Sequence, residues 1–346
     1  MVVCAGAALV TGFLAPPWWL DVHVYAGYGL CVLLAFRLVW GFAGSRYSRF
    51  DSFVLSVSAA RSHLVRSLAR DAPGYAGHNP LGVWMAVLLL VLLGALTVSG
   101  LIVLGGQEKQ GPFAGAIGFQ AGHTFKGLHE IAAWTLLVAV VVHVAGVLME
   151  EFVIKRPVLV AMVTGCKAGN GRAGPDAADT VRGAGVFIIL AAGLVVGGVF
   201  LSTAAEPRAL RFPAVFEAEC GACHAVYHPS LRSGATWNRL MAGLSDHCGE
   251  DVPLDVGAAA EISAFLGANG AERHDTEVAW RIGRVETESL RMTDTYYWKR
   301  HHREIPNVLF RWRSVGAKIN CNGCHGDAAG GRYADQEISL PEGAPR

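Results

Sequence analysis

The stretch "GLHEIAAWTLLVAVVVHVAGVL", Gly127 to Leu148, decides the fold of the first half of the chain. The predicted span Leu128–Met149, which starts within this stretch and ends one residue beyond it, is mostly apolar and supplies the roughly 20 residues that a transmembrane helix needs. His129 and His143 lie within it, on one face of a helix and about 21 Å apart along its axis. Ionisable residues inside a membrane span are costly and usually functional. The spacing therefore predicts one haem site near each membrane surface, and two histidines hydrogen-bonded between helices are the alternative.

The composition places the rest of the first half in a membrane as well. The chain has 346 residues, of which 52% are hydrophobic and 16% charged, which is too apolar for an ordinary soluble protein. Three further stretches are long and apolar enough to span: Val22–Phe42, Gly82–Leu104 and Gly183–Leu201. Val2–Leu14 is apolar but short and has no basic start, so we expect the end of a truncated span and not a signal peptide. A net charge of +1 argues against nucleic-acid binding.

Basic residues predict the orientation of the spans, because cytoplasmic loops carry an excess of Lys and Arg. They gather in the first and third connections between the spans, whereas the second connection, Gly105–Gly127, holds few. The first set is Arg46, Arg49, Arg61, Arg66 and Arg70, and the second is Lys155, Arg156, Lys167, Arg172 and Arg182. We therefore expect Trp18 and Trp19 in the outer aromatic belt, and everything after Ser202 outside the cytoplasm.

Two Cys-x-x-Cys-His runs stand in this exported segment, within "ECGACHAVYH" (Glu219–His228) and "NCNGCHG" (Asn320–Gly326). This pentapeptide is typical of c-type haem attachment, in which two thiols form thioethers and the histidine binds iron. Zinc would not need a histidine directly after each pair, and a redox dithiol needs a βαβ pattern that is not visible. The predicted attachment residues are Cys220, Cys223, Cys321 and Cys324, with His224 and His325 as iron ligands.

Each of these irons needs a sixth ligand. The candidates are His228, His247, His274, His301, His302, Met241 and Met292. The segments "LMAGLSDHCGE" (Leu240–Glu250) and "YYWKRHHREI" (Tyr296–Ile305) make residues 212–341 similar to the dihaem cytochrome c family. The resemblance implies that His247 and His302 are the axial ligands, with His301 as the second choice for the latter. Cys248, where the family has an aromatic residue, is expected to be a buried thiol.

The first half resembles the prokaryotic cytochrome b561 family, which includes b-type subunits of nickel–iron hydrogenases. The motifs are "VHVYAGYGLCVLLAFRLVWGFAGSRYSRF" (22–50), "GHNPLGVWM" (77–85) and the 127–148 stretch, and the match covers most of residues 1–168. The family implies a four-helix bundle with two b haems, each held by histidines of different helices. His23 and His129 would bind the outer haem. His143 would bind the inner haem with a histidine of the first span, which this chain lacks; the inner haem is otherwise absent or held by His143 and another group.

Other polar residues near the spans receive a structural interpretation. His63, His78 and His123 are expected at the surface of the loops. Arg37 either extends its charge to the membrane surface or pairs with a haem propionate. Glu130 either orients His129 or faces water.

The sequence thus predicts an all-α protein: a transmembrane helical bundle that binds b haem, followed by a loop-rich dihaem cytochrome c domain. The expected domains are residues 1–168, a linker with an additional transmembrane helix at 169–204, and a periplasmic domain at 205–346. With one or two b haems and two covalent c haems, we expect an electron carrier of the bacterial inner membrane. Its expected partners are membrane lipid, quinone or quinol or a partner dehydrogenase, and a soluble periplasmic acceptor or donor. The alternatives are a terminal reductase with an exchangeable c-haem ligand and a haem sensor or assembly factor.

Overall fold

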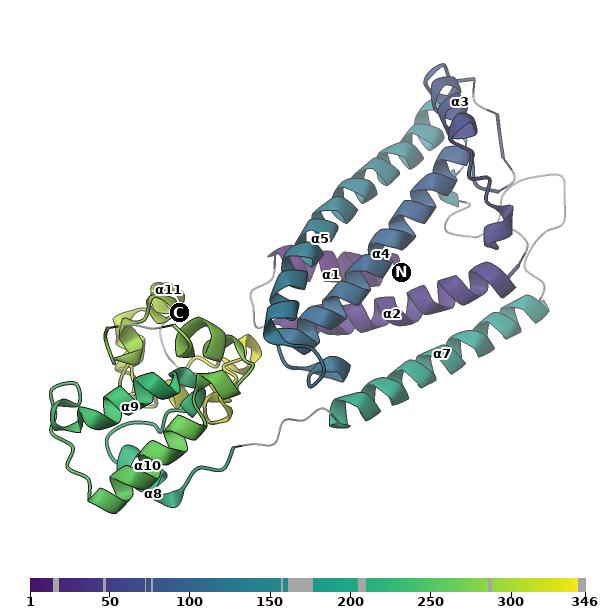
Figure 1. Ribbon diagram of the computed structural model, residues 1–346. Helices are drawn as coiled ribbons and strands as arrows, with labels where there is room; N and C mark the ends of the chain where they lie inside the picture. Colours follow the sequence, from purple (N-terminus) through teal and green to yellow (C-terminus); the bar gives the residue numbers. More distant parts are fainter. Residues whose placement is uncertain are drawn as a thin grey trace. The chain divides into compact units, whose positions relative to one another are not determined.

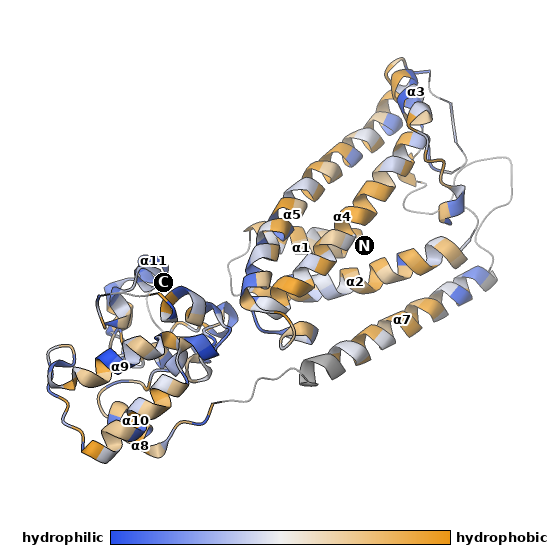
Figure 2. Ribbon diagram, in the orientation of Figure 1, coloured by the Kyte–Doolittle hydropathy of each residue, from blue (hydrophilic) through white to orange (hydrophobic). Residues whose placement is uncertain are grey.

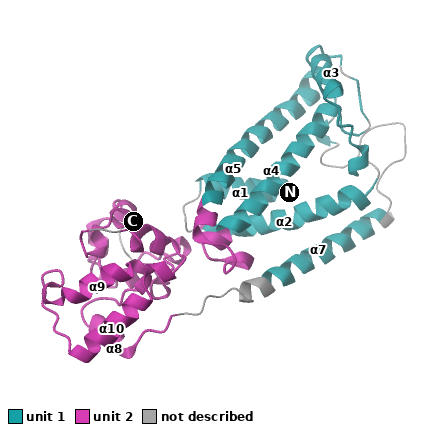
Figure 3. Ribbon diagram, viewed as in Figure 1, with its two compact units in different colours: residues 1–15, 20–103, 124–203 teal, residues 16–19, 104–123, 204–346 magenta. Residues whose placement is uncertain are grey.

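The computed structural model describes residues 1–14, 19–45, 48–71, 73–75, 77–156, 158–160, 177–204, 210–285 and 288–341. Over these ranges the chain forms helices, turns and two isolated β-bridges and no strand, which confirms the predicted all-α class. It divides into two compact units, residues 1–15, 20–103 and 124–203, and residues 16–19, 104–123 and 204–346 (Figure 3). The predictions that involve Trp18, Arg46, Lys167, Arg172 and the domain boundaries at 168/169 and 204/205 concern positions outside the described residues.

Four helices of the first unit are long and apolar enough to cross a membrane (Figures 1 and 2). They are α2 (Leu20–Ala43), α4 (Pro80–Gly106), α5 (Phe119–Leu148) and α7 (Ala177–Ala204). Three of these helices contain one predicted span each and extend it at both ends. The fourth predicted span, Leu128–Met149, lies within α5 except for its last residue. The chain continues from α5 into a π-helical turn, Met149–Val153. A shorter apolar helix, α1 (Val2–Leu14), precedes them.

The centre of the bundle is a small apolar core. Leu30 of α2, Leu93 of α4 and Leu136 of α5 are buried against one another, and residues of α1 pack on this cluster. α7 lies along α2, where the Phe36 and Phe187 rings are 5.6 Å apart between centroids. Most other apolar side chains point outward, as they do in proteins whose solvent is lipid.

A short helix, α3 (Val57–Leu68), lies in the connection between α2 and α4. Ser56 begins it by accepting a hydrogen bond from the backbone N–H of Ala59 at 3.2 Å. Its buried face is Ala60, His63 and Ser67. The prediction of a surface position for His63 is therefore wrong: only 2% of this residue is exposed, because α3 turns it toward Glu150 at the end of α5. His78 and His123 are exposed, as expected.

The second unit consists of short helices separated by long turns, as the sequence predicts for residues beyond the last span. The helices are α8 (Ala214–Cys220), α9 (Gly234–Ala242), α10 (Val256–Ala268), α11 (Tyr296–His302) and α12 (Asn307–Phe310). Ser233 caps α9 and Asp255 caps α10, each through its side-chain oxygen.

Two small apolar cores hold this unit together. Phe216, Trp237, Ile262 and Leu266 join α8, α9 and α10. The Trp237 indole N–H donates to the Pro229 carbonyl at 2.8 Å, so the ring is fixed as well as buried. Leu231, Val278, Ile282 and Met292 form the other core.

Candidate haem sites

The two Cys-x-x-Cys-His runs begin at helical turns in the second unit. Cys220 ends α8, and Cys321 opens a 3₁₀ turn, Cys321–Gly323. In the second run the backbone N–H of His325 donates to the Cys321 carbonyl at 2.9 Å, so the thiols and the imidazole share one tight segment. Burial raises the pKa of the Cys220 and Cys321 thiols to about 11, which keeps both protonated at neutral pH. None of the four cysteines of the two runs forms a disulfide, so all four sulfurs are left for thioether bonds to haem.

The structure brings a second imidazole opposite each of the two run histidines. The ring centroids of His224 and His247 are 6.3 Å apart, and those of His302 and His325 are 6.2 Å apart. Two imidazoles that bind one iron from opposite sides have centroids about 6 Å apart, since each metal–nitrogen bond is about 2 Å and each nitrogen lies about 1 Å from its ring centre. Both pairs therefore fit a six-coordinate haem iron.

A third pair with the same spacing lies in the membrane unit. The His23 ring of α2 and the His129 ring of α5 are 6.1 Å apart between centroids. Glycines border both rings: a Cβ atom on Gly12 would lie 3.2 Å from His23 Cε1, and one on Gly100 would lie 3.3 Å from His129 Cε1. Glycine lets the backbones of α1 and α4 approach the two rings closely, and the spacing of the pair is that of two ligands of one iron.

Hydrogen bonds at the Nδ1 atoms orient these rings. His23 Nδ1 lies 2.9 Å from the Ala8 carbonyl, His224 Nδ1 lies 2.7 Å from the Ala225 carbonyl, and His302 Nδ1 lies 2.8 Å from the Trp298 carbonyl. A carbonyl can only accept, so Nδ1 carries the proton and the Nε2 lone pair is left for a metal. This is the tautomer that an iron ligand requires.

His129 is oriented by a residue that the sequence did not indicate. Its Nδ1 atom lies 2.9 Å from the Ser99 hydroxyl of α4, whereas Glu130 is exposed. Of the two interpretations of Glu130, the structure favours the solvent-facing one. Serines are common in apolar helices, and only the packing of α4 on α5 gives Ser99 this partner.

Comparison with known proteins identifies both halves. Residues 216–333 match the family model for dihaem cytochrome c, and residues 1–165 match the model for prokaryotic cytochrome b561. This chain joins a cytochrome b561 to a dihaem cytochrome c. The fusion is an integral membrane protein that binds haem b in its first part and two haems c in its second.

Two curated relatives resemble the cytochrome b561 part. They are a probable Ni/Fe-hydrogenase B-type cytochrome subunit of Bradyrhizobium diazoefficiens, 29% identical over 161 residues, and one of Azotobacter chroococcum mcd 1, 29% identical over 162 residues. Each alignment covers 41% of this chain, and it covers 64% and 65% of the respective relatives. The chain therefore spans slightly less than two thirds of the length of these relatives.

Two solved structures resemble the dihaem part. The dihaem cytochrome c from Rhodobacter sphaeroides is 32% identical, with 35% of this chain and 96% of that chain covered, and a TM-score of 0.30. A dihaem cytochrome c from Shewanella baltica OS155 is 26% identical, with 38% and 96% covered, and a TM-score of 0.30.

The remaining ligand candidates of the cytochrome c part make other contacts. His301 is exposed and stacks on Tyr297, with 4.2 Å between ring centroids. Met292 belongs to one apolar core, and Met241 packs against the other. His228 and His274 face each other, 4.8 Å apart between centroids. The ligand assignments to His247 and His302 stay predictions, and this placement supports them.

Cys248 differs from its expectation. The sequence predicts a buried thiol, but the side chain is exposed. Its φ of 61° lies in the left-handed region, in a tight turn whose carbonyl at Cys248 accepts from Arg291 Nη2 at 2.9 Å. The turn directs the side chain outward, so the prediction is wrong.

Fewer contacts in the structure support an inner haem in the cytochrome b561 part. His143 is half-buried on α5, and within the described ranges no hydrogen bond or ring contact to another residue involves it. Arg37 lies with its guanidinium carbon 4.7 Å from the Phe50 ring centroid, and its Nη1 atom is buried without a hydrogen-bond partner in the described part of the chain. A buried guanidinium nitrogen requires an acceptor, which favours the propionate interpretation of Arg37.

The buried pair of His228 and His274 predicts acid sensitivity. His228 is 2% exposed, and its Nδ1 accepts from the Ser230 backbone N–H at 3.2 Å. Burial, and then the neighbouring His274, lower the pKa of His228 to about 4. An unfolded histidine takes up a proton near pH 6.5. Between pH 6.5 and 4 the unfolded chain therefore binds more protons than the folded chain, and the free energy of unfolding decreases as the pH is lowered. We expect a loss of up to about 3 kcal/mol over this window.

This is measured by thermal unfolding of the purified cytochrome from pH 7 to pH 4. His228→Asn keeps a side-chain hydrogen-bonding group but does not titrate, so its stability should fall less steeply than that of the wild type. His301→Asn removes an exposed histidine and serves as the control. Parallel curves for the wild type and His228→Asn would contradict the prediction.

Proposed function

We propose that this cytochrome transfers electrons across the bacterial inner membrane, between quinone or a partner dehydrogenase and a soluble periplasmic carrier. The observation that carries the proposal is the set of three imidazole pairs with the spacing of six-coordinate iron. Each haem bound in this way takes up and releases one electron. Iron with two histidine ligands has no open position for a substrate, so the geometry favours electron transfer over substrate chemistry.

The direction across the membrane follows from the position of the ligands and of the basic loops. His23 and His129 lie at the end of the bundle from which the basic loops are absent, so the outer haem would face the side to which the second unit is exported. The names of the two curated relatives support a hydrogenase-like dehydrogenase as one donor. A quinol is the other donor that the membrane location allows.

The experiment uses the purified full chain in proteoliposomes. A short-chain quinol is added, and in a parallel experiment hydrogenase subunits with H₂ replace it. The absorption bands of the b and c haems are followed separately, together with the reduction of an added soluble cytochrome c. We expect the b band to be reduced first, then the c band, then the soluble acceptor. His129→Ala should block the quinol-driven reaction while dithionite still reduces the c haems. Haems that dithionite reduces but neither donor reduces would overturn the proposal, and carbon monoxide binding to the reduced c haems would favour the reductase.

A further inference from the structure

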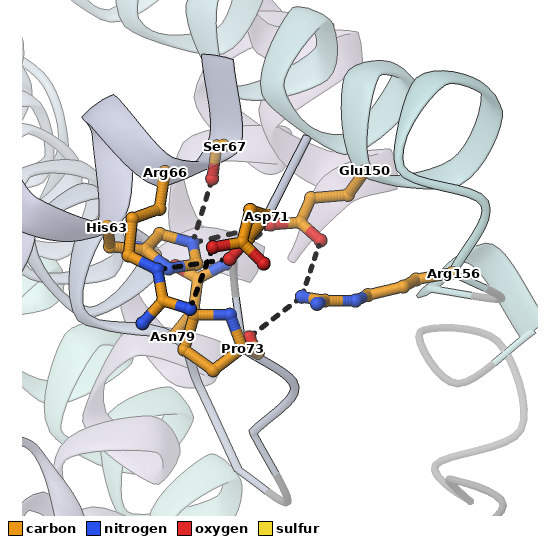
Figure 4. A network of polar contacts seen from close by, with 9 residues as sticks. His63, Arg66, Ser67, Asp71, Pro73, Asn79, Glu150 and Arg156 are labelled. Carbon is orange, nitrogen blue, oxygen red and sulfur yellow. Dashed lines mark hydrogen bonds and ion pairs between the residues drawn. The ribbon is translucent and has the colours of Figure 1, made fainter. Parts of the chain in front are cut away.

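A cluster of polar residues, shown in Figure 4, lies at the end of α5 away from His129. Its central residue is Glu150, about 31 Å further along α5 than His129. Glu150 Oε1 accepts from Asn79 Nδ2 at 3.2 Å and lies 3.4 Å from His63 Nε2. Glu150 Oε2 lies 3.5 Å from Arg156 Nη1. Three separate segments of the chain thus converge on one carboxylate.

His63 has a free nitrogen in this cluster. Its Nε2 atom is shared between Glu150 and the Ser67 hydroxyl, which is 3.4 Å away, and its ring meets the Tyr75 ring at 5.4 Å between centroids. Its Nδ1 atom is buried and has no hydrogen-bond partner among the described residues. Buried polar atoms nearly always have a partner, so this nitrogen is left for a group that these residues do not supply, such as a water. Histidine is the side chain that changes its charge near neutral pH.

The turn that ends α5 holds two carboxylates. Glu150 lies in this π-helical turn, Met149–Val153, a form in which helices commonly end. The neighbouring Glu151 has a different task, because its Oε2 accepts the backbone N–H groups of Val158 and Leu159 at 2.7 and 2.9 Å. Glu151 therefore binds backbone N–H groups, whereas Glu150 faces His63.

We propose that His63 and Glu150 are a proton-transfer pair, which carries protons between the cytoplasm and a quinone that reacts at this end of the bundle. The inference rests on the proposed function. Reduction of a quinone to a quinol consumes two electrons, taken one at a time from haem b, and two protons; oxidation of a quinol releases the same numbers. At this end of the bundle the electrons would come from an inner haem b, for which His143 would be a ligand. For reduction, each proton enters at His63 Nδ1, passes from Nε2 to the Glu150 carboxylate and leaves it for the quinone oxygen. Oxidation reverses each transfer.

Charged residues of α3, of the loop after it and of the segment after α5 lie near the pair, whereas the start of α4 contributes the uncharged Asn79 (Figure 4). Arg156 faces Glu150 and also donates to the Pro73 carbonyl at 2.9 Å, which fixes the guanidinium. Arg66, on the same helix as His63, pairs with Asp71 at 3.3 Å, with both side chains exposed. Ser67 and Tyr75 complete the surroundings of the imidazole. A link that only stabilises the packing of α3 against the end of α5 would use these same contacts. The test must therefore separate a proton-transfer role from a structural one.

The test compares Glu150→Gln and His63→Gln with Glu151→Gln in the full chain in proteoliposomes. The amide introduced by Glu150→Gln keeps an oxygen for Asn79 but cannot release a proton, and Glu151→Gln removes the same charge from the same turn. We expect the first two variants to slow quinol-driven reduction of haem b by about tenfold or more at pH 7, with a flattened pH profile. Haem content, melting temperature and reduction by dithionite should stay at wild-type values, and Glu151→Gln should behave as the wild type. Free imidazole should restore part of the rate in His63→Gln.

The experiment distinguishes failure of the proposed quinol reaction from failure of the proton-transfer proposal. A wild type that does not react with quinol would remove the proposed quinol reaction itself. A reactive wild type with unchanged rates and pH profiles in both Glu150→Gln and His63→Gln would overturn the proton-transfer pair alone. Slow variants that also lose haem or melt early, and that imidazole does not restore, would assign the pair a structural role and overturn the proposal as well.

Discussion

A chain in which Cys321 and Cys324 are both replaced by Ala should carry one covalent haem instead of two. A thioether needs the sulfur of a cysteine, and these two thiols belong to one run that is separate in sequence from the Cys220–His224 run. Intact-mass measurement of the denatured chain, together with a haem stain of the gel band, counts the attached groups directly. We expect the wild type to carry two and the double variant one.

The exposed Cys248 provides a control for this experiment. It lies next to His247 but outside both runs, so Cys248→Ala should keep both covalent haems. The reciprocal change at Cys220 and Cys223 should also leave one. A wild-type chain without any covalent mass, or a Cys321/Cys324 variant that still carries two groups, would contradict attachment at these runs.

The features that could be predicted from the sequence depend on residues that are close together in the chain or on the length of an apolar stretch. Covalent attachment depends on five consecutive residues, so the runs at Cys220 and Cys321 are visible directly. The spans depend on length and apolar content, and each predicted span lies within one observed helix. The choice of His302 over His301 comes from a family pattern, and the structure places His302 opposite His325.

The features that could not be predicted depend on the packing of distant segments. Ser99 and the Ala8 carbonyl orient His129 and His23 only because α1 and α4 meet α2 and α5. His63 is a sharper case, since its helix buries Ala60, His63 and Ser67 and leaves Leu68 exposed. An apolar periodicity would assign the neighbouring face, with Val57, Leu64 and Leu68, to the interior, but these three side chains are exposed. The polar contact with Glu150 decides the orientation of α3, and no local pattern contains it.

Replacing His302 with Ala should convert one c haem from low spin to high spin, whereas His301→Ala should leave both low spin. His302 faces His325 at 6.2 Å between centroids, and its ring is fixed by stacking on Trp298 at 4.3 Å and by the hydrogen bond from Nδ1 to the Trp298 carbonyl. His301 stacks on Tyr297 instead. Loss of the sixth ligand opens a coordination position, which electron paramagnetic resonance of the oxidised protein and carbon monoxide binding to the reduced protein both detect.

The helical geometry makes this comparison decisive, because the two neighbours cannot exchange roles without a large movement. Successive residues of an α-helix are about 100° apart around its axis, so α11 can direct only one of the two imidazoles at His325. The Thr295 hydroxyl caps the start of α11, accepting from the Trp298 backbone N–H at 3.3 Å, and this contact fixes the rotation of the helix. A high-spin signal in His301→Ala with none in His302→Ala would require α11 to be turned by about that angle, against both the cap and the stacking of Trp298 on His302.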